Sequence, residues 1–281
     1  MHLGIYWSRA VRAALGALAA IASVSAATAA DQVGKYRVFE TEVTNDRDYG
    51  NKFADVELFV TYTSPSGKVR EFWGFFDGDG AGGGDKSTGD VWKMRFMPDE
   101  VGVWKYAYRW SDGTKGGEGT FECTEENAGK GIIKPYTENP HWFAYNGEDP
   151  VWLKSYYETG HGGIAQDFDW VSENVYQPLI DNGYNHIMVN WLMSLCCFKQ
   201  YYLDGPEPST FDLALYENGK ASSTMNLNVW KLMERRMAWL NDRNVGVHMF
   251  LGFDGSRNDG PRWEDLSDRE KEFYVKYAVA R

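Results

Sequence analysis

The stretch "VWKMRFMPDEVGVWKYAYRW" (91–110) carries the pattern that decides the fold of the first half of this chain. Its two ends, 91–97 and 103–110, are rich in β-branched and aromatic residues that partly alternate in character, as in half-buried β-strands. Between them, "PDEVG" (98–102) combines proline, acidic residues and glycine, which is typical of a turn. The stretch therefore predicts two strands separated by a short connection.

The same texture extends outward in both directions. Further strands are predicted at 36–43, 55–63, 69–76 and 119–123. Turn sequences separate them, at "SPSG" (64–67), "DGDGAGGGD" (77–85) and "SDGTKGG" (111–117). Short strands at this spacing, without an intervening helix, predict an antiparallel β-sandwich of immunoglobulin-like size. We assign it to residues 31–125.

A change of texture at 126–140 predicts a linker, and beyond it strands and helices alternate. Strands are expected at 151–157, 186–192 and 246–254, and helices at 169–183, at 228–243 and from Ser267 onward. This βαβαβα order predicts a parallel sheet covered by helices. A complete (β/α)8 barrel needs about 250 residues, whereas 141–281 contains 141. The region is therefore either a small open α/β domain or the first part, about three βα units, of a TIM-type barrel.

Local signals mark the ends of these helices. Ser267 and Glu270 have the spacing of a capping box, which predicts a helix start. Gly183 closes the first helix and Pro178 interrupts it. On the helix at 228–243, one apolar side is predicted to contain Val229, Leu232, Met233, Met237 and Leu240.

The first 30 residues have the features of a Sec-type signal peptide. Arg9 and Arg12 precede a short apolar segment, and small residues follow it, so cleavage is expected near Ala29 or Ala30. The apolar segment is too short to span a bilayer, and no later segment is long enough. We therefore expect a secreted or periplasmic protein without a membrane span.

Charge and composition narrow the function classes. The net charge of −11 argues against nucleic acid, which requires a basic surface. Aromatic residues make up 16% of the chain, with 12 Trp and 17 Tyr. Exposed aromatic rings can stack on sugar rings, whereas buried rings would only fill a β-rich core. No nucleotide-binding motif, nucleophile elbow or metal-ligand spacing is present, so we expect no cofactor.

Candidate binding residues lie at the expected carboxyl ends of the parallel strands, where barrels carry their chemistry. They are Tyr156, Glu158, Asn190, Trp191, His248 and Asp254. Each could contact a sugar, or could instead hydrogen-bond to the rim of the sheet. For His248, which lies within its strand, a satisfied interior histidine is the competing interpretation.

The acidic turn "DGDGAGGGD" offers a weak calcium candidate in Asp77, Asp79 and Asp85. Ala81 stands where an EF-hand has a ligand, and no glutamate closes a loop of that type. A hairpin turn is the favoured interpretation, and we predict no metal site.

The first half resembles a β-sandwich domain of unknown function that precedes predicted glycoside hydrolase barrels in secreted bacterial proteins. In this family a "DGDG"-like turn is followed by the pattern "W-x-x-R-F-x-P-x-x-x-G-x-W-x-Y". The matching positions are Trp92, Arg95, Phe96, Pro98, Gly102, Trp104 and Tyr106. The second half resembles the start of the following barrel, through "NPHWFAYNGEDPVWLKSYYE" (139–158), "LIDNGYNHIMVNW" (179–191) and "YVKYAVAR" (274–281).

The resemblance implies a glycoside hydrolase that cleaves a polysaccharide or oligosaccharide with two carboxylates. Both carboxylates are expected beyond residue 281, so no catalytic residue is assigned and the 281-residue chain is expected to be inactive. A non-catalytic, secreted carbohydrate- or matrix-binding sandwich remains the alternative. Trp104, Trp110 and Trp142 exposed in a row would favour binding, whereas the same residues packed between the domains would favour a bracing role.

Overall fold

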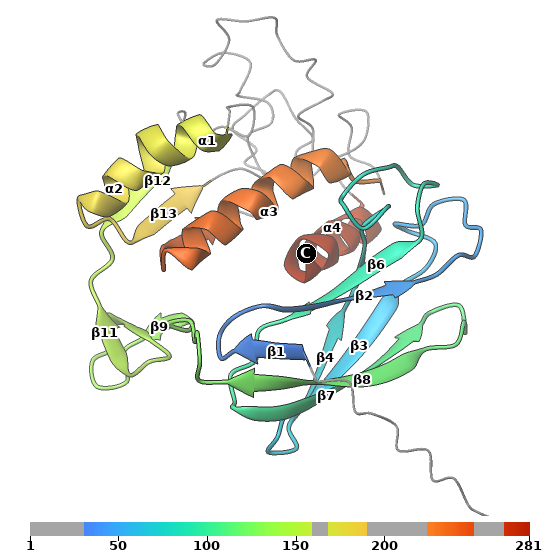
Figure 1. Cartoon of the computed structure of the whole chain (residues 1–281), viewed down its shortest axis with the longest axis horizontal. Coiled ribbons are helices and arrows are strands. Elements are labelled where there is room, and N and C mark those ends of the chain that lie inside the picture. The colour runs from blue at the N-terminus through green and yellow to red at the C-terminus, as the bar shows by residue number, and fades with distance from the viewer. Residues whose placement is uncertain (1–30, 159–167, 190–223, 250–266) are drawn as a thin grey trace, which may run out of the picture. The chain divides into compact units, whose positions relative to one another are not determined.

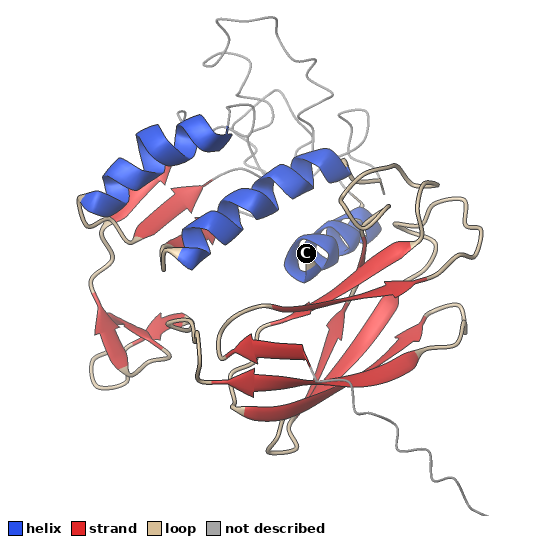
Figure 2. Cartoon of the chain, in the orientation of Figure 1, coloured by secondary structure: helices blue, strands red, loops and turns tan. Residues whose placement is uncertain are grey.

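The computed structural model describes residues 31–158, 168–189, 224–249 and 267–281 (Figure 1). These residues form mainly open β-sheets, with few helices (Figure 2). The predicted signal peptide at 1–30 lies outside the described residues. Within the described part of the chain, no helix combines the length and hydropathy that a membrane crossing requires.

Five strands form the larger sheet of the first half. In sheet order they are β1 (Asp31–Gly34), β8 (Gly117–Thr124), β7 (Gly102–Trp110), β3 (Leu58–Thr63) and β4 (Val69–Trp73). The neighbours from β8 to β4 are antiparallel, as predicted, but β1 runs parallel to β8. Strand β1 escaped prediction because "DQVG" has a single β-branched residue. The expected purely antiparallel sandwich is corrected accordingly.

Three strands form the opposing sheet, namely β2 (Phe39–Thr44), β6 (Val91–Phe96) and β5 (Phe75–Phe76). Trp92 and Met94 of β6 are buried in the core between the sheets. Trp92 meets Trp110 of β7 edge-on, with ring centroids 5.1 Å apart. The two strands of the 91–110 stretch therefore lie in different sheets, and Lys93 and Arg95 occupy the outer face of β6 because side chains alternate along a strand.

The segment predicted as a linker contains part of a third sheet. Strands β9 (Ile133–Pro135), β10 (Phe143–Tyr145) and β11 (Asp149–Val151) are antiparallel, in the order β11-β10-β9. Asn146 and Gly147 in the β10–β11 turn both have positive φ, which Asn and Gly tolerate best. The segment predicted as a linker at 126–140 thus contains a strand that was not predicted, at 133–135.

The fourth sheet is parallel, as the alternation of strands and helices predicted. It contains β12 (Ser155–Glu158), β13 (His186–Val189) and β14 (Gly246–Met249), in that order. Strand β12 begins later than predicted because 149–151 pairs with β10 instead. The predicted continuations at 190–192 and 250–254 lie outside the described residues.

The first helical segment is divided into α1 (Phe168–Val171), the π-helix η1 (Ser172–Tyr176) and α2 (Gln177–Asp181). Pro178 lies in the first turn of α2, where its missing N–H is tolerated, so the predicted interruption falls just before it. Gly183 has φ 79°, and the N–H of Tyr184 donates to the carbonyl of Leu179 at 3.0 Å. This confirms Gly183 as the helix terminator.

Helix α3 (Leu227–Asp242) lies within one residue of its predicted range, and its buried side includes Met233 and Leu240, as predicted, but not Leu232 and Met237. The buried apolar residues are Leu227, Trp230, Met233 and Leu240. Leu232 and Met237 are 37% and 38% exposed, and the side chain of Val229 lies outside the described residues. The helix buries the side that contains Trp230, because a tryptophan removes more apolar surface from water than a leucine.

Helix α4 (Asp268–Ala280) begins at the predicted capping box. The Ser267 hydroxyl accepts from the N–H of Glu270, and the Glu270 carboxylate accepts from the N–H of Ser267 at 2.7 Å. Tyr274, Tyr277 and Ala280 are buried. Helix α4 packs against β4, and α3 packs against β14.

Candidate functional site

The carboxyl ends of the three parallel strands meet at one edge of the sheet. Glu158, the last residue of β12, lies beside Val189 of β13, which lies beside Met249 of β14. Asn190 and Trp191 follow Val189 directly but lie outside the described residues, as does Asp254. The side chain of Glu158 is also not described. The register therefore places the carboxyl ends of the three strands side by side. The positions of the predicted binding side chains beyond these ends stay a prediction.

Tyr156 lies on the face of the sheet that is covered by the first helical segment. It lines a surface hollow of about 670 Å³ with Trp170 and Asn174. Tyr156 is half-buried and is the register partner of Ile187 on β13. The side chain thus faces a helix-lined hollow.

His248 is exposed on β14, so the interior position considered for it is wrong. The buried histidine of this sheet is its neighbour His186 on β13, with ring centroids 6.1 Å apart. The Oγ of Ser155 lies 2.8 Å from Nδ1 of His186. Burial, together with the nearby His248, lowers the pKa of His186 below its ordinary value of 6.5.

The three aspartates of the glycine-rich turn make different contacts. Asp79 accepts from the N–H groups of Ala81 and Gly83, both at 2.8 Å, and these bonds lower its pKa. Asp85 caps the following turn at Ser87. Asp77 is buried and forms ion pairs. The favoured turn interpretation agrees with these bonds, and within the described ranges no cluster of three His, Cys, Asp or Glu could hold a metal ion.

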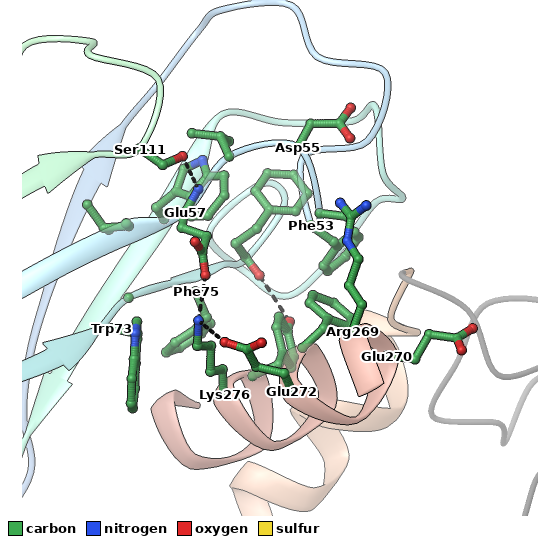
Figure 3. Close-up of a pocket in the computed structure, with 18 of the residues that line it drawn as sticks. Phe53, Asp55, Glu57, Trp73, Phe75, Ser111, Arg269, Glu270, Glu272 and Lys276 are labelled. Atoms are coloured by element: carbon green, nitrogen blue, oxygen red, sulfur yellow. Dashed lines mark hydrogen bonds and ion pairs between the residues drawn. The ribbon is translucent and has the colours of Figure 1, made fainter. Parts of the chain in front are cut away.

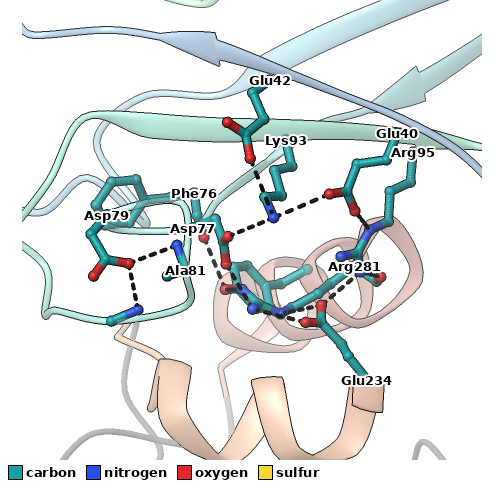
Figure 4. A network of polar contacts seen from close by, with 12 residues as sticks. Glu40, Glu42, Phe76, Asp77, Asp79, Ala81, Lys93, Arg95, Glu234 and Arg281 are labelled. Atoms are coloured by element: carbon teal, nitrogen blue, oxygen red, sulfur yellow. Dashed lines mark hydrogen bonds and ion pairs between the residues drawn. The ribbon is translucent and has the colours of Figure 1, made fainter. Parts of the chain in front are cut away.

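Six charged side chains form a closed ring between the β2–β6–β5 sheet and helices α3 and α4 (Figure 4). In order around the ring they are Asp77, Arg281, Glu234, Arg95, Glu40 and Lys93. Carboxylates and cations alternate, so every charge has two opposite neighbours. Charges removed from water are tolerated when they are paired in this way.

The best-buried link of this ion-pair ring joins the turn after β5 to the end of α4. Nη2 of Arg281 lies 2.7 Å from Oδ1 of Asp77, and the two side chains are 1% and 2% exposed. Oδ2 of Asp77 lies 3.2 Å from Nζ of Lys93, which is 12% exposed. Burial lowers the pKa of Lys93, but the pairs with Glu40 and Asp77 outweigh this effect and raise it overall.

Glu234 of α3 completes the ring on the helical side. Its Oε1 lies 2.7 Å from Nε of Arg281 and 2.6 Å from Nη1 of Arg95. Burial raises the pKa of Glu40, but Arg95 and Lys93 outweigh it and hold that pKa below 4.5. One strand pair and two helices therefore share a single electrostatic network.

Aromatic rings pack around Tyr277 of α4, next to the ion-pair ring. Tyr277 of α4 packs against Phe53 and Phe75 at centroid distances of 5.8 and 5.9 Å, and against Trp230 of α3 at 5.3 Å. The buried Tyr277 hydroxyl donates to the carbonyl of Phe76 at 3.0 Å. This apolar contact lies next to the ion-pair ring and joins α3 and α4 to the first half of the chain. It supports the bracing role considered for the first half.

A cavity of about 670 Å³ opens beside this contact, between the sheets and α4 (Figure 3). Nζ of Lys276 lies there between Glu57 at 2.9 Å and Glu272 at 2.8 Å. Its ammonium also lies 5.6 Å from the ring centre of Trp73. Lys276 is thus shared by two carboxylates, and Asp55, Arg269 and Glu270 also line the cavity, so its lining is charged and aromatic with an excess of carboxylates.

Trp104, Trp110 and Trp142, whose exposure was expected to distinguish a binding role from a bracing role, differ in burial. Trp104 and Trp110 are buried in the core of the sandwich, at 0% and 4% exposed, so neither the exposed row nor the position between domains is observed. Trp142 is 50% exposed on the small third sheet. The bracing contact instead uses Phe53 and Phe75. Two period-two charge patterns, Glu40 and Glu42 on β2 and Lys93 and Arg95 on β6, were the sequence signal for this charged face, and the register places them opposite one another.

Two comparisons relate this chain to known proteins. Residues 32–111 match the family described as "Domain of unknown function (DUF5060)". A crystal structure of a protein from Bacteroides vulgatus, described as a "putative glycoside hydrolase", is similar in fold, with a TM-score of 0.62 and 20% sequence identity. No curated protein matches the sequence significantly.

The structural similarity covers 89% of this chain and 47% of the Bacteroides chain. The present chain thus spans about half the length of that protein. At 20% identity the similarity shows the fold alone, and it includes both the sandwich and the parallel strands.

Proposed function

We propose that this chain is the N-terminal part of a secreted glycoside hydrolase. Residues 31–125 would form the immunoglobulin-like sandwich, and 141–281 the first three βα units of a (β/α)8 barrel. The observation that carries the proposal is the in-register parallel sheet β12–β13–β14, together with a fold similar to the Bacteroides protein. Residues 1–30 would be removed as a signal peptide on export.

The proposed substrate is a polysaccharide or oligosaccharide bound at the carboxyl edge of the parallel sheet. Such hydrolases use two carboxyl groups, one as acid and the other as nucleophile or base. In the whole protein these groups would lie beyond residue 281. Glu158, Asn190 and Asp254 would hydrogen-bond sugar hydroxyls, and Trp191 would stack on a ring face.

The sandwich would contribute rigidity to this site. Helix α3 connects the ion-pair ring to β14, because Glu234 binds Arg95 of the sandwich while α3 packs on β14. A binding edge held on rigid elements keeps its contacts in productive geometry. The sandwich therefore acts as a brace for the parallel sheet.

The test is hydrolysis by the protein encoded by the complete reading frame. It would be incubated with aryl glycosides and a panel of polysaccharides, and reducing ends would be measured. Asn190→Ala should lower kcat/KM about 100-fold, the effect of removing one polar contact to the transition state. Asn228→Ala, an exposed position on α3, is the matched control and should leave kcat/KM unchanged.

Two results would contradict the proposal. One is the absence of hydrolysis on every glycan by the folded complete protein. The other is full glycosidase activity in the 281-residue chain, because the proposed catalytic carboxylates would then be unnecessary. Equal activity of Asn190→Ala and Asn228→Ala would remove the substrate contact assigned to Asn190.

A further inference from the structure

The small sheet β9–β10–β11 aligns three aromatic residues across its strands. Phe143 pairs with Pro135 on one side and with Val151 on the other. Extending each register by one residue places Trp142 opposite both Tyr136 and Trp152. The backbone bond from the N–H of Tyr136 to the carbonyl of Trp142, at 2.9 Å, continues the ladder to this position. The three residues, here called the aromatic row, occupy corresponding positions on adjacent strands.

The two tryptophans of the aromatic row lie side by side and are open to solvent. Their ring centroids are 5.9 Å apart, with planes inclined at 53°. Trp142 is 50% exposed and Trp152 is 73% exposed. The backbone of Trp152 is fixed, because its carbonyl accepts from the side-chain amide of Asn185 at 2.9 Å. Two neighbouring indoles are thus held on an ordered sheet without being buried by it.

Exposure of this kind needs a physical reason. A tryptophan side chain can bury about 150–250 Å², and this chain buries Trp92, Trp104 and Trp110 almost completely. Adjacent exposed aromatic rings on one surface are a common mark of a binding site. The aromatic row therefore calls for a ligand that removes the indole faces from water.

The surroundings favour a ligand with both apolar faces and hydroxyl groups. The Tyr136 hydroxyl donates to the Glu138 carboxylate at 2.7 Å, so a polar pair lies at one end of the aromatic row. The next positions across the same face are Lys134, Ala144 and Pro150, which do not extend the aromatic surface. A pyranose ring has an apolar face for the indoles and hydroxyls for such a rim.

A protein partner fits this surface less well. A stable protein interface buries roughly 800 Å² on each partner, and two partly exposed indoles with a polar rim supply much less apolar surface. An extended sugar chain needs only a narrow track, and the aromatic row crosses three strands in one line. The occupant is therefore best described as successive sugar rings of one glycan chain.

We infer that the aromatic row is a glycan-binding platform that holds substrate without reacting with it. Trp152 lies before the first residue of β12, whereas Glu158 is the last residue of that strand. The platform therefore lies toward the opposite end of β12 from the proposed substrate edge. The choice of a glycan as ligand rests on the proposed function, but binding here requires no catalysis.

The test is affinity electrophoresis of the full chain in native gels that contain xylan, carboxymethyl cellulose, galactomannan, soluble starch or polygalacturonate. At least one polysaccharide should retard the chain. Trp142→Ala and Trp152→Ala should each raise Kd about tenfold, equivalent to about 1.4 kcal/mol. Phe143→Ala is the matched control, because Phe143 is 51% exposed on the same strand and alternation directs it to the other face.

Circular dichroism spectra would establish that each variant is folded. Retardation by no polysaccharide in the panel would overturn the inference, and so would equal retardation of the double tryptophan variant and the control. Hydrolysis by the complete protein, measured separately, keeps the two proposals distinct. Hydrolysis without retardation refutes the platform alone, whereas tryptophan-dependent retardation without hydrolysis refutes only the proposed function.

Discussion

Replacing Asp77 with asparagine removes one charge from the ion-pair ring and keeps the shape of the side chain. Asp77 is 2% exposed, and it is the only carboxylate in the ring that contacts both Arg281 and Lys93. After the substitution, Arg281 retains Glu234 and Lys93 retains Glu40. Each cation therefore loses one of its ion pairs at a largely buried site.

The expected loss of stability follows from this geometry. Breaking a buried ion pair by removing one partner costs about 3–5 kcal/mol. Because both cations keep a second carboxylate, we expect the lower end, about 3 kcal/mol. Glu42→Gln is the matched control, since Glu42 is 54% exposed and lies 3.5 Å from Lys93. An exposed pair contributes about 0–1 kcal/mol.

Urea unfolding followed by tryptophan fluorescence measures both variants. At an m-value of about 3 kcal/mol/M, the Asp77→Asn midpoint should fall by roughly 1 M, and the Glu42→Gln midpoint by much less. Trp92 and Trp110 report on the sandwich, and Trp230 reports on α3. Because the ion-pair ring joins these two parts, their fluorescence should change in one shared transition. Equal midpoints for the two variants would refute the argument that the ring joins the sandwich to the helices.

Three further predictions concern single positions. The pKa of His186 is lowered in the folded state, so the unfolded chain binds more protons below pH 6.5. The free energy of unfolding should therefore fall as pH drops from 7.5 to 5.5. His186→Asn should flatten this pH profile, measured by urea titration at each pH. Gly89→Ala should unfold at a much lower urea concentration than Gly67→Ala. Both glycines have positive φ, but only the added Gly89 methyl would overlap backbone atoms, whereas Gly67 has open space around it. Gly67→Ala should therefore lose only about 1–2 kcal/mol of stability, and equal urea midpoints for the two variants would contradict this. Ser267→Ala should lower stability by about 1 kcal/mol through loss of the capping box, and unchanged thermal unfolding would argue against the cap.

Local signals in the sequence predicted much of the fold. The capping box at Ser267, the helix terminator at Gly183 and the strands within 91–110 are each encoded by a few neighbouring residues, and each is confirmed. Parallel pairing of β12, β13 and β14 followed from the order of the elements. These features depend on backbone preference and hydrophobic period, which a single sequence displays directly.

Features that depend on long-range packing were missed. The short strands β1 and β9 exist because they pair with β8 and β10, and neither has a strong strand signal of its own. The buried side of α3 is selected by Trp230, although Leu232 and Met237 belong to an equally plausible apolar stripe. The local pattern of these segments does not reveal which partner each will meet.

The candidate site shows the same division. The strand order placed Glu158 at the carboxyl edge of the parallel sheet, as expected for a barrel. The ion-pair ring was not predicted, because it brings Asp77 to Arg281 across 204 positions of sequence. The aromatic row became visible only once the β10–β11 register set Trp142 opposite Trp152.

The most direct test of the central claim is to read the coding DNA past codon 281. If the chain is the first part of a glycoside hydrolase barrel, the frame continues into further βα units. The next strand should then end in an asparagine and a glutamate, and a second carboxylate should end a later strand. A stop codon directly after Arg281 would contradict the claim that this protein hydrolyses glycans.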